Sequence, residues 1–114
     1  MKANELRIGN WVHSGLTDTD FIIDAHDIRN ISAGFDNGKT QPILLTEEWL
    51  LKFGFEFNNL NETYFFEKFS FRLYLRENEL YHNWMGGNVF IKHVHQLQNL
   101  YFALTGEELK IKQQ

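Results

Sequence analysis

The chain has 114 residues, a formal net charge of −4 and no cysteine. This length fits a single domain, and a chain of this size buries about two thirds of its unfolded surface, enough for a core without disulfides. The lack of cysteine excludes disulfides, thiolate nucleophiles and cysteine-based zinc sites, and the acidic balance disfavours binding to duplex DNA. Aromatic residues make up 16% of the chain, so the rings either fill the core or form an exposed contact surface.

The first 45 residues are typical of short strands. Apolar residues between Leu6 and Val12 and the run 21–23 predict two strands, and Ile28 with Ile31 predicts a third. The Asn37-Gly38 pair favours a tight turn that would bring Ile31 beside Ile43. This pattern fits either a small SH3-like barrel or a twisted open sheet.

A short helix is predicted over residues 47–53. Thr46 is a suitable N-cap, since its hydroxyl can accept a hydrogen bond from a free main-chain N–H of the first turn. Two glutamates follow in that turn, where the helix dipole favours negative charge. Gly54 can adopt the left-handed conformation that ends a helix, and Phe55 would then touch Leu50.

An antiparallel meander and a closing helix are predicted after residue 54. Apolar and polar residues alternate most clearly over 70–76, where the side chains point to opposite faces in turn. The spacing of apolar residues predicts a helix over 94–105, ended by Gly106. The expected strands are 55–57, 63–68, 70–76, 80–85 and 88–92, with turns at 58–61, 77–79 and 86–87.

These elements predict an α+β protein with one domain over residues 1–114. A β-rich part, for which an SH3-like barrel is one candidate, would span 1–45. The second part, 46–114, would consist of a helix, the meander and the closing helix. The expected core residues are Trp11, Ile22, Leu50, Phe53, Phe71, Leu73, Leu97, Leu100 and Leu104.

A basic and aromatic strand face is the main candidate binding surface. Arg72, Tyr74 and Arg76 share one face of the predicted strand 70–76, and Tyr64 and Lys68 are placed near them. Arginine beside aromatic rings suits a protein interface or stacking on single-stranded bases. The same pattern is also typical of the solvated outer face of a half-buried sheet.

The histidines give a weaker candidate, a metal site. His93 and His95 form a His-x-His pair, and His82 on the preceding strand is a possible third ligand. A strand-to-helix junction with partly exposed histidines explains the same pattern. Four aspartates lie between Asp18 and Asp27, but the glycine and glutamate of an EF-hand loop are missing. No catalytic-serine motif or phosphate-binding glycine loop occurs, so no catalytic residue and no cofactor are predicted.

Three strings of the sequence carry a resemblance to a known family. MKANELRIGNWV, PILLTEEWLLKFGF and VHQLQNLYFALTGEEL resemble an uncharacterised family of small proteins of gut anaerobic bacteria and their phages or mobile elements. The family has no assigned activity, so no functional residue carries over. The resemblance implies a bacterial or phage accessory protein.

Three functions remain open at this point. A non-catalytic accessory protein that binds a protein partner is favoured, followed by a nucleic-acid binder that uses the strand face, and a metal-dependent enzyme around the histidines. No apolar run approaches the ~20 residues that cross a bilayer, and MKANELRIGN has no apolar signal region. We therefore expect a cytoplasmic protein without a membrane partner.

Overall fold

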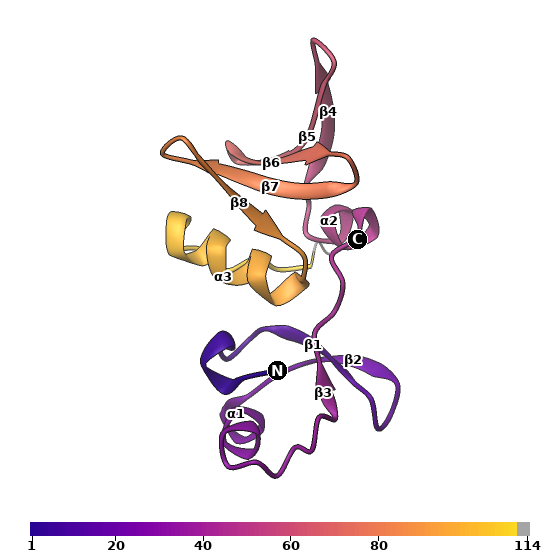
Figure 1. Cartoon of the computed structure of the whole chain (residues 1–114), viewed down its shortest axis with the longest axis vertical. Helices are drawn as coiled ribbons and strands as arrows, with labels where there is room; N and C mark the ends of the chain where they lie inside the picture. The colour runs from indigo at the N-terminus through magenta and orange to yellow at the C-terminus, as the bar shows by residue number, and fades with distance from the viewer. Residues whose placement is uncertain (112–114) are drawn as a thin grey trace.

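The computed structural model describes residues 1–111 and shows an α+β fold with two antiparallel sheets (Figure 1). The first sheet, in the order β2-β1-β3, belongs to the N-terminal part. The second is a meander of five strands, β4 to β8 in sequence order. The N-terminal elements are a 3₁₀ turn η1 (Ala3–Glu5), β1 (Trp11–Ser14), β2 (Thr19–Ile22), α1 (Ala25–Ser32) and β3 (Thr40–Gln41).

The N-terminal part differs from the sequence prediction in two respects. Residues 28–31 lie in helix α1 and not in a strand, because Asp24 caps the helix and its carboxylate accepts a hydrogen bond from the Asp27 N–H. Ile31 therefore forms no hairpin with Ile43, and β3 pairs instead with β1. Because β2 and β3 are both edge strands, this sheet is open and forms no SH3-like barrel in residues 1–111.

Helix α2 (Glu47–Lys52) confirms the predicted first helix and both of its ends. The Thr46 hydroxyl accepts a hydrogen bond from the Trp49 N–H at 3.4 Å. At the other end Gly54 has a φ of +89°, which favours glycine, and the Phe55 N–H donates to the Leu50 carbonyl at 3.0 Å. These two bonds satisfy two of the main-chain groups that the ends of a helix leave free.

The meander consists of strands joined by two-residue turns. Its strands are β4 (Glu56–Leu60), β5 (Thr63–Lys68), β6 (Phe71–Arg76), β7 (Glu79–Trp84) and β8 (Gly87–Ile91). Both residues of every turn have positive φ, as type I′ hairpins require. The turns are Asn61-Glu62, Phe69-Ser70, Glu77-Asn78 and Met85-Gly86, so they recur every eight residues. The turn expected at 58–61 was wrong, since Asn58 to Leu60 belong to β4.

Helix α3 (Val94–Thr105) has the predicted bounds and packs with α2 against one face of the meander (Figure 1). Of the expected core residues, five are buried: Leu50, Phe53, Phe71, Leu73 and Leu97. Trp11, Leu100 and Leu104 are partly buried against this core. Ile22 was wrong: it is exposed, and its neighbour Ile23 is buried in a second small cluster with Leu6 and Val12.

A polar seam joins the N-terminal part to α3. The buried Gln98 amide accepts a hydrogen bond from the Trp11 N–H at 2.8 Å and donates one to the Gly9 carbonyl at 3.1 Å. The buried Asn10 donates to Asn99 at 2.8 Å. Each of these polar groups therefore has a partner, as burial requires.

Candidate functional site

Four aromatic side chains form a row across the outer face of the meander. The strand register places Phe65 opposite Tyr74, Tyr74 opposite Tyr81, and Tyr81 opposite Phe90. Directly opposed residues share a face, and the ring centroids are 5.8, 5.6 and 5.6 Å apart in that order. We call these four residues the aromatic row. Their exposure rises along the row, from the buried Phe65 to Phe90, which is 56% exposed.

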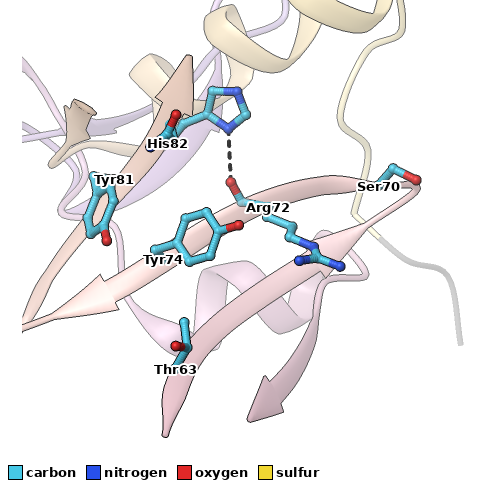
Figure 2. A pocket seen from close by; sticks show the side chains of 7 residues that line it. Thr63, Ser70, Arg72, Tyr74, Tyr81 and His82 are labelled. Atoms are coloured by element: carbon cyan, nitrogen blue, oxygen red, sulfur yellow. Dashed lines mark hydrogen bonds between the residues drawn. The ribbon is translucent and has the colours of Figure 1, made fainter. Parts of the chain in front are cut away.

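Arg72 lies next to the aromatic row and covers its buried end. Its guanidinium lies over the Phe65 ring, 4.6 Å from the centroid, and its Nε donates to Glu67 at 2.6 Å. This hydrogen bond, together with the neighbouring Tyr74, raises the pKa of Arg72, so the guanidinium is charged at every relevant pH. In Figure 2 the Tyr74 hydroxyl points toward Arg72. Arg72 is therefore held in place before any ligand arrives.

A shallow hollow of about 420 Å³ opens beside the two tyrosines. Thr63, Arg72, Tyr74, Tyr81 and Asn83 are among the residues that line it (Figure 2). The hollow offers ring faces together with hydroxyl, amide and guanidinium groups. Ring faces can stack on a flat or extended ligand, and the polar groups can form hydrogen bonds with it. The arrangement therefore suits ligand binding.

The structure brings together three of the four predicted surface residues. Arg72, Tyr74 and Arg76 share the outer face, where Arg76 is opposite Glu79. Tyr64 is opposite Leu75, so it lies on the other face of the sheet, stacked against Phe57 at 6.0 Å. The placement of Tyr64 beside the arginines was wrong, because alternation along β5 puts Phe65 on that face instead.

Lys68, which the sequence pattern also placed near Arg72, lies on the opposite face of the sheet. It is opposite Phe71, and its Nζ donates to the Phe53 carbonyl at 2.6 Å. Burial lowers the pKa of Lys68. Its charge therefore serves the end of helix α2 and not the outer face of the meander.

The three candidate metal ligands do not form a site. His82 donates from Nδ1 to the Arg72 carbonyl at 2.9 Å and its ring stacks on Phe71, on the side of β7 away from Tyr81 (Figure 2). His93 and His95 stack on each other at 5.8 Å at the start of α3, so they do not lie on a strand. Within residues 1–111 no three His, Asp or Glu side chains converge on a point that could hold a metal ion.

His95 is the one buried side chain in the described chain with an unpartnered polar atom, its Nδ1. Burial lowers the pKa of His95, and the neighbouring His93 lowers it further. The imidazole is therefore neutral near pH 7.

The aspartates between Asp18 and Asp27 do not act as one cluster, and two of them contact a histidine. Asp20 and Asp18 contact the two ring nitrogens of His13 at 2.8 and 3.0 Å. Asp24 and Asp27 lie instead at the start of α1, where they form a capping box. The hydrogen bond to Asp20 is the main reason why the pKa of His13 is raised.

Sequence reasoning missed three members of the aromatic row: Phe65, Tyr81 and Phe90. Their pairing depends on the turn positions, and the turns predicted at 58–61, 77–79 and 86–87 each differ by at least one residue from the turns in the structure. The positions 65, 74, 81 and 90 follow from the eight-residue spacing of the turns, so that spacing is the signal that could have revealed them.

The chain was compared with known proteins, and no protein-family model, no curated protein and no solved structure matches it. The resemblance of its three strings to a bacterial and phage family stays a prediction. Among the helices of residues 1–111, none has both the length and the apolar character needed to span a membrane.

Proposed function

We propose that this chain is a non-catalytic accessory protein that binds a protein partner through the outer face of its meander. The observation that carries the proposal is the aromatic row, four rings on four adjacent strands beside a preorganised arginine. Tyrosine, phenylalanine and arginine are enriched in the buried centres of protein interfaces. Both helices that pack on the meander contribute to the core on its opposite face.

The charge of this face supports a protein partner over a nucleic acid. By register, Arg72 and Arg76 share the face with Glu56, Glu67 and Glu79. Arg72 is already paired with Glu67 at 2.6 Å. A strand of nucleic acid would have to compete with Glu67 for Arg72, and its phosphates would lie near three carboxylates.

The cellular setting belongs to the same proposal. The absence of cysteine and the resemblance to proteins of bacteria and their mobile elements support action in the cytoplasm. In that setting the partner would be a host or phage protein.

Site-specific photocrosslinking tests the proposal in cells that express the protein. A photoreactive side chain at Phe90 should give a discrete crosslinked product that contains a protein other than a second copy of this chain. The same group at Phe35, which is 74% exposed but distant in the fold, is the control. Adding Tyr74→Ser and Tyr81→Ser should reduce the crosslinked product at Phe90 at least tenfold, since central interface aromatics contribute more than ~1.4 kcal/mol.

The outcomes separate the two binding functions. Equal crosslinking from Phe35 and Phe90, or a product that survives the tyrosine substitutions, would contradict a partner on this face. Binding of a labelled single-stranded oligonucleotide at low salt, abolished by Arg72→Ala, would favour the nucleic-acid function instead. Circular dichroism of each variant shows that the loss does not come from unfolding.

A further inference from the structure

We propose that strand β8 pairs with β8 of a second copy of this chain, so that two meanders join into one ten-stranded sheet. The inference goes beyond the proposed function and does not rest on it. It starts from the edges of the meander, because an edge strand presents free N–H and C=O groups that can pair with another strand.

The free groups of β8 follow from its hairpin with β7. The turn Met85-Gly86 has two residues, so the flanking pair Trp84 and Gly87 exchanges hydrogen bonds. The pattern alternates, and the main-chain groups of Asn88, Phe90 and Lys92 therefore point to the open side. The hydrogen bond from the Leu45 N–H to the Lys92 carbonyl, at 2.8 Å, agrees with this assignment.

The chain closes this edge at one end only. The Lys92 carbonyl is bonded to Leu45, and the Lys92 N–H donates to the Gln96 side chain at 3.0 Å. No hydrogen bond within residues 1–111 occupies the open-side groups of Asn88 and Phe90. A hollow of about 470 Å³ between β8 and α3 lies against Val89 and Phe90. Open space therefore lies beside Phe90, one of the two residues whose main-chain groups are free.

The composition of β8 lacks the features that protect edge strands from pairing. Its five residues, Gly-Asn-Val-Phe-Ile, contain no charge and no proline. The other edges are protected in different ways: β4 carries Glu56, β2 carries Asp20, and β3 is only two residues long. The β7–β8 hairpin also exposes apolar side chains: Trp84 by 51%, Met85 by 89%, Val89 by 42% and Phe90 by 56%. Self-pairing of β8 brings no like charges together, whereas a charged residue or a very short strand protects each of the other three edges.

One antiparallel register uses all the free groups. It places Asn88 opposite Phe90 of the second copy, and by symmetry Phe90 opposite that copy's Asn88, with Val89 facing its own counterpart on the twofold axis. Four hydrogen bonds then form between the copies. A shift of two residues in one direction would pair Asn88 with Lys92, whose groups are already bonded. A shift in the other direction would place Phe90 opposite Gly86, in the turn.

Multi-angle light scattering and sedimentation of the full chain test the pairing. At roughly 5 to 200 µM, a range that detects micromolar homodimers, the wild type should approach about 27 kDa, twice the chain mass of 13.6 kDa. Asn88→Pro removes a main-chain N–H that points to the open side, so it should weaken the dimer at least tenfold. Asn88→Thr keeps that N–H and should leave the dimer intact. Asn59→Pro is the matched control on the β4 edge.

A charge exchange at Val89 tests the register even if the proline variant unfolds. Val89→Lys and Val89→Glu each place like charges opposite one another at the axis, so each protein alone should be monomeric. A mixture of the two should restore the dimer, because lysine then faces glutamate. A monomeric wild type across the range, a dimer lost with Asn59→Pro but kept with Asn88→Pro, or a mixture that stays monomeric would overturn the proposal.

Discussion

The Lys68 ammonium donates a hydrogen bond to the main-chain carbonyl of Phe53, 2.6 Å away, and so links strand β5 to the end of helix α2. The Nζ also lies 3.5 Å from the position that a Cβ would take on Gly54. The last carbonyls of a helix lack partners within the helix and carry partial negative charge, so a cation there satisfies both needs. Lys68 thus fixes the meander to the helix that precedes it.

Lys68→Met should destabilise the protein by about 1 kcal/mol. Hydrogen bonds from charged donors contribute ~1.5–3 kcal/mol, and partial exposure to solvent reduces that value. Urea denaturation gives the free energy of unfolding. Lys39→Met is the matched control, because Lys39 lies at an exposed position just before β3, and it should change stability by less than ~0.5 kcal/mol. Equal losses from both variants would contradict the role assigned to Lys68.

Gln98→Ala should destabilise the protein by about 2–4 kcal/mol. The substitution leaves the Trp11 N–H and the Gly9 carbonyl without their partner at a buried seam, and each unsatisfied group costs ~1–3 kcal/mol. Gln41→Ala, at an exposed position of β3, should stay within ~0.5 kcal/mol. A cost for Gln98→Ala no larger than that of the control would show that the seam does not hold the two parts together.

Loss of His13 should destabilise the protein more at low pH than at high pH. The hydrogen bonds to Asp20 and Asp18 raise the pKa of His13 above 6.5, so the folded state binds the proton more tightly than the unfolded state. This contribution is fully present below pH 6.5 and is lost as the pH rises through the raised pKa. His13→Gln should therefore lower the urea midpoint more at pH 5.5 than at pH 8.5. A pH-independent difference, or an NMR titration midpoint below 6.5, would refute the assignment.

His95→Leu should stabilise the protein by about 1 kcal/mol, because it removes a buried nitrogen that has no partner in the described structure. Burial lowers the pKa of His95, so the wild type loses stability as the pH falls below 6.5, and the gain should be larger at pH 5.5 than at pH 8. His82→Leu is the contrast, since it breaks a hydrogen bond to the Arg72 carbonyl and should destabilise. Destabilisation by both substitutions would mean that the His95 nitrogen is satisfied.

Replacing Phe69-Ser70 by Asn-Gly should stabilise the protein by about 1–2 kcal/mol. Both residues have positive φ, 48° and 71°, which costs free energy for phenylalanine and serine and little for asparagine and glycine. The thermal midpoint is the measurement. The same exchange at Leu73-Tyr74, inside β6, should be strongly destabilising. No gain at the turn would indicate that the exposed Phe69 ring contributes stabilising contacts.

The sequence predicted elements well where local chemistry determines them. Helices α2 and α3 have the predicted bounds or end within one residue of them, because Thr46, Gly54 and Gly106 satisfy particular main-chain groups. Helix α1 was missed although Ile28 and Ile31 have helical spacing and Asp24 with Asp27 forms a capping box. The β-branched isoleucines were interpreted as a strand, and the packing of these residues against the Leu6 cluster decided otherwise.

The candidate site was harder to predict, because it depends on how strands align. The alternation of side chains along a single strand was enough to place Arg72, Tyr74 and Arg76 on one face, because all three residues lie in β6. Phe65 and Phe90 required the positions of turns such as Phe69-Ser70, which contains no asparagine, aspartate or glycine, the residues preferred in type I′ turns. A shift of one residue in such a turn transfers a ring to the other face, as happened with Tyr64.

The constant distance between the hairpin turns determines which length changes the meander can accept. Loss or gain of one residue within a strand would exchange the faces of everything beyond it up to the next turn, burying charges and exposing core rings. Sixteen residues, by contrast, make up two strands with their turns, after which chain direction and side-chain orientation both return to their starting values. Relatives of this protein with wider or narrower sheets should therefore differ from it by whole hairpins. Each such hairpin would add two rings to the aromatic row or remove two rings from it.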